Sequence, residues 1–319
     1  MNKVFAGILC LFSLGSFAQD YPNKPIRMLV PFAPGGAVDT TARVLAQAME
    51  QRVKWNFVVE NRPGGNGFIA TTAAAKSAPD GYTLLMAHTG EFAVNPALFN
   101  DVPYELERDF VAITMVSDAP MLYLANINAP FNTFQELVAQ AKAKPGSISF
   151  GSAGNGSINH LAGEWLAQAA GIQLLHVPYK GGAPAAAAVA AGDVSFGVMA
   201  APGAMPHIKS GRGKVIGITT AKKSPLDPSW ATPRDAGIPD LDASIWVGLF
   251  APKGTPQAIV DRISAEVRQT LTMPDVQKKF VESAGGEAIW MSPTDFLARI
   301  KADAERYKRV VQKAGVKPG

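Results

Sequence analysis

Short apolar runs alternate with segments of helical periodicity along most of the chain. The apolar runs predict strands at 26–30, 57–59, 82–87, 121–125, 148–150, 174–177, 194–199 and 215–219. Helical spacing is clearest after residue 37, where Val38, Ala42, Leu45 and Met49 recur every three or four positions. Strands that alternate with helices predict an α/β fold, with parallel sheets covered by helices on both faces.

The same patterning predicts two lobes. Further helices are expected at 133–144, 157–170, 256–271 and 293–314, and the last two begin with Pro, which a first helical turn tolerates. Breaks rich in Pro, Gly, Lys and Ser fall near 117–120 and between 210 and 228. We interpret them as two crossings between lobes, which places lobe one at 19–119 plus 226–319 and lobe two at 120–225. About 300 residues exceed what a single core usually serves.

Residues 1–18 have the composition of a signal peptide. Lys3 precedes an apolar run at 4–15, and Ser16-Phe17-Ala18 supplies the small-x-small cleavage pattern. The run stops at Gln19, short of the ~20 apolar residues of a membrane span, and no later stretch is longer. The only cysteine, Cys10, lies in this segment, so the mature chain would have no thiol for a disulfide or a thiolate site. We therefore expect a periplasmic protein.

Charge and motif content argue against several function classes. The formal charge is +4, and the basic residues are scattered, whereas nucleic-acid binding needs a concentrated patch. The four histidines show no metal-binding spacing, and no nucleophile elbow, phosphate loop or dinucleotide fingerprint occurs. We expect a monomer with no metal, no cofactor, no catalytic residue and no nucleic-acid partner.

Two glycine-rich loops carry the candidate chemistry. They span 31–39 (PFAPGGAVD) and 151–160 (GSAGNGSINH), and each joins a predicted strand to a predicted helix. Glycine allows close backbone approach, and a helix N-terminus offers free N–H groups and partial positive charge to an anion. Neither loop contains Lys or Arg, which suits a carboxylate better than a phosphate. The pair predicts a small carboxylate held between two facing helix ends, although both loops also fit ordinary strand-to-helix turns.

Several side chains in these loops could have either a structural or a ligand-binding role. Asp39 either stabilises its helix N-terminus or accepts a hydrogen bond from the ligand, in which case it would attract an ammonium group. Ser152 and Ser157 would donate to a carboxylate, but Ser157 is also placed to cap a helix. Phe32 would either stack on an apolar ligand body or pack in the core.

Several motifs, in order along the chain, resemble one known family. They read YPNKPIR at 21–27, VPF at 30–32, ENRPGG at 60–65, PDGYTL at 79–84, NPAL at 95–98, HVPYKGG at 176–182 and WVGLFAP at 246–252. Together with the two loops, they resemble the Bug-type extracytoplasmic receptors of tripartite tricarboxylate transporters. The resemblance covers essentially the whole chain after residue 20.

This resemblance implies a two-lobed type II periplasmic-binding-protein fold that closes on a small carboxylate and delivers it to membrane transporter subunits, without catalysis. The residues that it places at the ligand are Phe32, Ala33, Gly35, Gly36, Asp39, His88, Thr89, Ser152, Ala153, Gly154, Ser157, Tyr179 and Ala200. Many members have Asp-Asn where this chain has Met199-Ala200, so we hypothesise a ligand with an apolar or aromatic body.

Two other functions fit the same lobes. One is a sensory module that binds the same ligand, and the other is an α/β enzyme that uses His88, Glu91 or Asp39 as a general base. Ligand identity stays open among di- and tricarboxylates, aromatic carboxylates and acidic amino acids, because it depends on a few side chains that patterns do not place.

Overall fold

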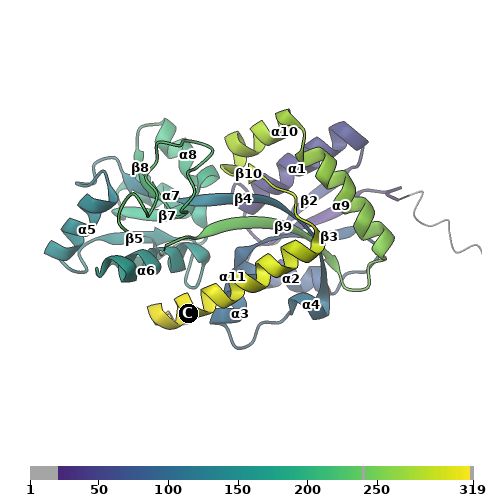
Figure 1. The fold of residues 1–319 in the computed structure, drawn as a ribbon, viewed down its shortest axis with the longest axis horizontal. Helices are drawn as coiled ribbons and strands as arrows, with labels where there is room; N and C mark the ends of the chain where they lie inside the picture. Colours follow the sequence, from purple (N-terminus) through teal and green to yellow (C-terminus); the bar gives the residue numbers. More distant parts are fainter. Residues whose placement is uncertain (1–20, 239–240, 317–319) are drawn as a thin grey trace, which may run out of the picture.

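Two halves joined by two long strands make up the structure, a computed structural model that describes residues 21–238 and 241–316 (Figure 1). The signal peptide predicted at 1–18 lies outside the described residues. The first half contains β1 (Ile26–Val30), α1 (Ala37–Val53), β2 (Phe57–Asn61), η1 (Gly65–Gly67), α2 (Phe68–Ala75), β3 (Thr83–His88), η2 (Gly90–Val94), α3 (Asn95–Leu98), α4 (Leu106–Asp109), α9 (Gln257–Leu271), α10 (Pro274–Lys279), η3 (Phe280–Ala284) and β10 (Glu287–Ala288).

The second half is built from the middle of the chain. It contains α5 (Phe134–Ala143), β5 (Ser149–Ser152), α6 (Ile158–Ala170), β6 (Leu175–Pro178), α7 (Gly182–Ala191), β7 (Phe196–Ala200), α8 (Ala201–Lys209) and β8 (Gly213–Ile218). Three elements run between the halves: β4 (Phe110–Asn126), β9 (Ser244–Pro252) and the long helix α11 (Pro293–Ala314) (Figure 1).

The strands form a mixed sheet in the order β2-β1-β3-β9-β4-β7-β5-β6, and β8 and β10 also pair with β4. β1, β2 and β3 are parallel, as are β5, β6 and β7. The expectation of parallel sheets is wrong for the sheet as a whole, because β9 is antiparallel to both β3 and β4, and β4 is antiparallel to β7 and β8. The cause is topological: β4 carries the chain out of the first half, and β9 returns it in the opposite direction.

β4 ties the two halves into one framework. Its residues 110–120 pair with β9, whereas its residues 121–126 pair with β7 and β8. Trp246 on β9 and Tyr123 on β4 are fully buried, so the strands that join the halves are packed in the core rather than exposed as a linker. α11 contacts β4, η2 and α3 and also reaches α6 of the second half.

Many predicted elements are confirmed, and a few were missed. β1 and α11 have the predicted bounds, and α1 begins at Ala37 with Val38, Leu45 and Met49 buried. The sequence did not predict β9, the first half of β4, or helices α7 and α8. Within the described residues, none of the helices is long and apolar enough to span a bilayer.

Candidate ligand-binding site

The carboxyl ends of the parallel strands in the two halves point toward each other. β1 and β3 run antiparallel to β9, and β9 runs antiparallel to β4, so β1 and β3 share the direction of β4. β5, β6 and β7 run against β4. Because β4 continues from one half into the other, the strands of each half run toward the other half. Ligands of open α/β sheets bind beyond the carboxyl ends of strands, so the candidate site lies between the halves.

The predicted loops lie at these facing ends. The segment 31–36 joins β1 to α1, 153–157 joins β5 to α6, and 179–181 joins β6 to α7, while Ala200 joins β7 directly to α8. Four helices therefore begin beside the interface, and each presents unsatisfied N–H groups and partial positive charge. The arrangement favours an anion without requiring a lysine or arginine in the loops.

The two halves already touch at this interface. Asn66 Nδ2 in the first half donates to the backbone oxygen of Asn155 in the second loop at 3.3 Å. Gly156 has a φ of +70°, and a Cβ added there would lie 2.1 Å from Leu98 Cδ2 on α3. Helices α1 and α8 are also in contact. The second loop is therefore packed against the first half.

The Asp39 carboxylate holds the first loop from inside. It is only 3% exposed. Its Oδ2 accepts the Gly35 N–H at 2.9 Å, its Oδ1 accepts Asn61 Nδ2 at 2.9 Å, and Arg43 Nε lies 3.0 Å from both oxygens. Asn61 Nδ2 also reaches the Phe32 backbone oxygen at 2.9 Å. Asp39 thus positions a loop whose residues Ala33, Pro34 and Gly35 are exposed.

The protonation of Asp39 makes this anchor sensitive to acid. Burial alone would raise its pKa, but hydrogen bonds from Arg43, Gly35 and Asn61 together hold the pKa below its ordinary value. A carboxyl whose folded pKa is depressed contributes stability that is present above the ordinary pKa of about 3.9 and lost as pH falls below it.

We expect Asp39→Asn to lower the free energy of unfolding by about 1–2 kcal/mol at pH 7, because charged hydrogen bonds become neutral ones. Urea unfolding from pH 7 to pH 3 measures this, and the gap to the wild type should shrink in acid as wild-type Asp39 gains a proton. Asp101→Asn, at an exposed position, changes the net charge equally and serves as the control. A gap that stays constant with pH would contradict the assignment.

His88 and Phe32 form a ring pair at the adjoining ends of β1 and β3. Their ring centroids are 4.6 Å apart. His88 Nδ1 lies 2.8 Å from Oε2 of the fully buried Glu91, which also accepts the His88 backbone N–H at 2.8 Å. The Phe32 ring is half-buried and packs against the core. Thr89, in contrast, is fully buried, and its Oγ1 donates to the Ser244 backbone oxygen.

The second loop is organised around its own backbone. Ser157 accepts the His160 N–H as the N-cap of α6 and donates to the Gly154 oxygen at 2.7 Å. Ser152 Oγ is buried and lies 2.7 Å from His176 Nε2, and it also accepts the Gly154 N–H at 3.1 Å. Ser157 therefore caps α6, and the Ser152 hydroxyl is engaged with Gly154 and His176 inside the second half.

Tyr179 and Ala200 are the remaining residues that were expected at the ligand. The Tyr179 N–H donates to the Ser152 backbone oxygen at 3.0 Å. The half-buried Tyr179 ring covers Gly151, where an added Cβ would lie 3.3 Å from Tyr179 Cε2. Ala200 is the N-cap of α8 and is half-buried. Met199 is fully buried, so only Ala200 of that dipeptide is placed to line a cleft.

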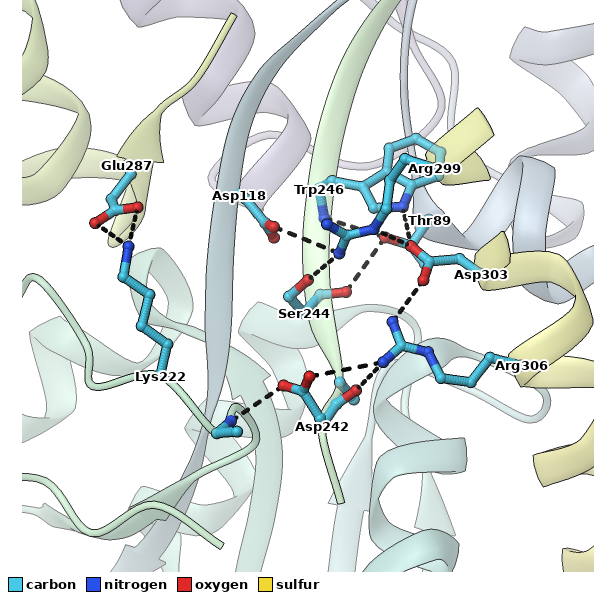
Figure 2. Close-up of polar contacts among 12 residues, drawn as sticks. Thr89, Asp118, Lys222, Asp242, Ser244, Trp246, Glu287, Arg299, Asp303 and Arg306 are labelled. Carbon is cyan, nitrogen blue, oxygen red and sulfur yellow. Dashed lines mark hydrogen bonds and ion pairs between the residues drawn. The ribbon is translucent and has the colours of Figure 1, made fainter. Parts of the chain in front are cut away.

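A polar cluster lies where the chain passes between the halves, and sequence reasoning did not predict it (Figure 2). We call it the crossover network; it comprises Asp118, Asp242, Ser244, Trp246, Arg299, Asp303 and Arg306. Its centre is Asp303, which is 3% exposed and accepts Trp246 Nε1 at 2.9 Å, Arg299 Nε at 2.8 Å and Arg306 Nη2 at 2.5 Å.

The rest of the crossover network connects α11 to both crossing segments. Arg299 Nη2 donates to Ser244 Oγ on β9 at 3.2 Å and lies 3.5 Å from Asp118 Oδ2 on β4. Arg306 Nη1 donates to the Asp242 backbone oxygen at 2.8 Å. Burial raises the pKa of Asp118, and the nearby Ser244 and Arg299 offset this rise only in part. No group of three His, Cys, Asp or Glu side chains in the described part of the chain is arranged to hold a metal ion.

Comparison with known proteins identifies the family. The model of the family described as "Tripartite tricarboxylate transporter family receptor" matches residues 41–316. The chain belongs to this family. It is 34% identical over 319 residues to a UPF0065 protein encoded in the tcbD-tcbE intergenic region of Pseudomonas sp. strain P51, covering 97% of this chain and 93% of the relative. It is also 34% identical to protein BugT of Bordetella pertussis, covering 94% and 92%. The resemblance to Bug receptors is therefore confirmed.

Solved structures confirm the periplasmic-binding-protein fold. A protein described as a periplasmic transporter has a TM-score of 0.87 at 36% identity, covering 93% of this chain and 99% of that one. A Rhodopseudomonas palustris protein with adipate has a TM-score of 0.90 at 30% identity, covering 94% and 100%. Malate-bound MatC from the same species has a TM-score of 0.82 at 29% identity, covering 91% and 100%. This chain is a solute-binding receptor of the family.

Proposed function

We propose that this receptor captures a small dicarboxylate between its two halves in the periplasm and delivers it to the membrane subunits of a tripartite tricarboxylate transporter. The observation that carries the proposal is the set of helix N-termini at the facing strand ends, and two of the loops before them, 31–39 and 151–160, contain no lysine or arginine. Backbone N–H groups and helix dipoles are well suited to a carboxylate. The adipate and malate held by two solved relatives support this ligand class.

The ligand-contacting residues in this proposal are those on the interface side of the loops. We assign ligand contact to Phe32, Ala33, Gly35, Gly36, His88, Ala153, Gly154, Tyr179 and Ala200. Asp39, Thr89, Ser152 and Ser157 instead position these residues, because their side-chain polar atoms are engaged inside their own half.

We also propose that the two halves are lobes that open and close about β4 and β9. In this proposal the first crossing lies near residue 120. The second lies near residue 244, later than the 210–228 expected from the sequence, because Leu226 and Trp230 pack on the second half and the Ala243 N–H donates to the Thr219 backbone oxygen. A ligand that contacts both lobes would shift the population toward the closed state.

A thermal-unfolding screen of the mature protein tests the function. The protein is first unfolded and refolded to remove any retained ligand, then screened with adipate, malate, citrate, an aromatic carboxylate and glutamate. We expect one aliphatic dicarboxylate to bind with near-unit stoichiometry in calorimetry. At a hundredfold excess over its dissociation constant, it should stabilise the fold by about 2.7 kcal/mol.

A receptor binds without turnover, so the bound dicarboxylate should be recovered unchanged after long incubation with sub-stoichiometric protein. Consumption of the ligand would favour an enzyme, and silence across the refolded panel would overturn the carboxylate class. Loss of uptake after gene deletion would support delivery to a transporter, whereas intact uptake with lost gene induction would favour a sensory module.

A further inference from the structure

Two histidines stack directly beneath the second loop. His160 lies on α6 and His176 on β6. Their ring centroids are 3.7 Å apart and the ring planes differ by 9°. Phe150 on β5 packs against both rings, with centroid distances of 6.3 and 4.9 Å. His160 is 7% exposed, so the pair forms a compact aromatic support inside the second half.

Each ring bonds to a different residue of the loop. His176 Nε2 lies 2.7 Å from Ser152 Oγ, at the point where β5 ends. His160 Nδ1 accepts the Gly156 N–H at 3.2 Å, and the His160 backbone N–H is capped by Ser157. The pair therefore holds the loop near both of its ends, and Ala153, Gly154 and Asn155 span the distance between those bonds.

These bonds define the protonation state of the stack. Since His160 Nδ1 accepts an N–H, its proton is on Nε2, which lies 3.6 Å from Glu164 Oε1. Within the described residues, Glu164 is the one carboxylate within ion-pair distance of either ring. A second proton on His160 would replace the acceptor of Gly156 with a donor. If His176 also bound a second proton, two cations would lie face to face in the stack, which is unfavourable.

We propose that the neutral His160–His176 stack is the positioning element that fixes the second loop for ligand binding, and that protonating the stack releases the loop. The inference rests on the proposed function for its ligand readout. The direct ligand contacts stay with the loop, and the histidines act through Ser152 and Gly156. In this proposal the buried Ser152 hydroxyl, which also bonds Gly154, links the histidine stack to the loop.

Burial, followed by the neighbouring His160, lowers the pKa of His176 to about 4. A histidine whose folded pKa lies below its ordinary value of about 6.5 binds its proton more readily when unfolded. It therefore contributes stability above pH 6.5 that is lost as pH falls toward 4. In the folded protein the loop should stay intact at neutral pH and loosen as pH approaches 4.

Variants that keep the hydrogen bonds but cannot titrate provide the test. Asn at 160 places an oxygen near the Nδ1 position, and Gln at 176 reaches the Nε2 position. The double variant His160→Asn/His176→Gln should bind adipate or malate at pH 7.5 within about threefold of the wild type. His160→Leu and His176→Leu, which remove the bonds, should each weaken binding about tenfold or more. His207→Gln, on α8 away from the loop, is the matched control.

The pH dependence of affinity distinguishes protonation of the histidine stack from protonation of the ligand. A dicarboxylate also gains protons near pH 4–5, but this affects the wild type and the double variant equally. We therefore expect affinity to fall more steeply in the wild type between pH 5.5 and 4. Identical profiles, or wild-type affinity in both Leu variants, would overturn the proposal.

A ligand-free readout keeps this inference distinct from the proposed function. In NMR spectra of the apo protein, the Gly154 and Gly156 amide signals should shift together with the His176 imidazole signals as pH falls toward 4. The same amide signals should not titrate in the double variant. If the glycine amide and His176 signals titrate together but no carboxylate binds, the role of the stack is supported and the proposed ligand class is rejected. If a carboxylate binds tightly but the signals do not titrate together, the ligand class is supported and the role of the stack is rejected.

Discussion

Replacing Asp303 with alanine should destabilise the protein more than any surface change, by about 3–5 kcal/mol. The carboxylate is 3% exposed and accepts bonds from Trp246 Nε1, Arg299 and Arg306. Its removal leaves two partly buried guanidinium groups without their central counter-charge, and breaking one side of a buried ion pair costs about this much. Because the crossover network joins α11 to β9, unfolding should remain a single transition with a lower midpoint. Urea denaturation followed by circular dichroism measures the loss.

The same helix offers a matched control. Lys301 pairs with Glu107 at 2.8 Å, but both side chains are 56% exposed. Exposed pairs contribute about 0–1 kcal/mol, so Lys301→Ala should leave the unfolding midpoint nearly unchanged. If Asp303→Ala and Lys301→Ala behaved alike, Asp303 would not be the centre of the network that Figure 2 shows.

Sequence patterns predicted the elements whose local signals agree with their surroundings. β1 is a compact apolar run, and α6 has Ser157 before it and Gly171, with a φ of +63°, after it. The elements that were missed lack such signals. α7 is alanine-rich without periodicity, and α8 contains Pro202 and Pro206. β4 continues through Asp118 and Pro120, residues that normally suggest a break, because the strand must pass from one half to the other.

The candidate site was predictable as loops but not as side-chain directions. Strand–glycine–helix patterns correctly predicted the two loops that lie at facing strand ends. The inward orientation of Asp39, Thr89 and Ser152 depends on partners far away in the sequence, such as Asn61, Ser244 and His176. The crossover network and the His160–His176 stack have the same origin. Their members come together only through the sheet register, in which Phe150 pairs with His176.

Gly156 is the second position where a small change should have a large effect, this time on ligand affinity. Its φ of +70° strains any other residue, and an added Cβ would lie 2.1 Å from Leu98 Cδ2 across the interface. Gly156→Ala should push the second loop away from α3 and disfavour the closed state. We expect the dissociation constant for the bound dicarboxylate to rise at least about tenfold, since each 1.4 kcal/mol lost from the closed state gives that factor. Calorimetry on the purified variant measures it.

Backbone strain and interface contact are separable by two further variants. Gly146 has a similar φ of +73° with nothing within 4 Å of an added Cβ, so Gly146→Ala should cost about 1–2 kcal/mol of stability and leave affinity intact. Leu98→Val removes the methyl group that meets the new Cβ, so adding it to Gly156→Ala should restore much of the affinity. Restored binding would show that closure itself was obstructed. Equal loss in Gly146→Ala, or no rescue by Leu98→Val, would instead trace the effect to the strained backbone and contradict a cleft that closes at Gly156.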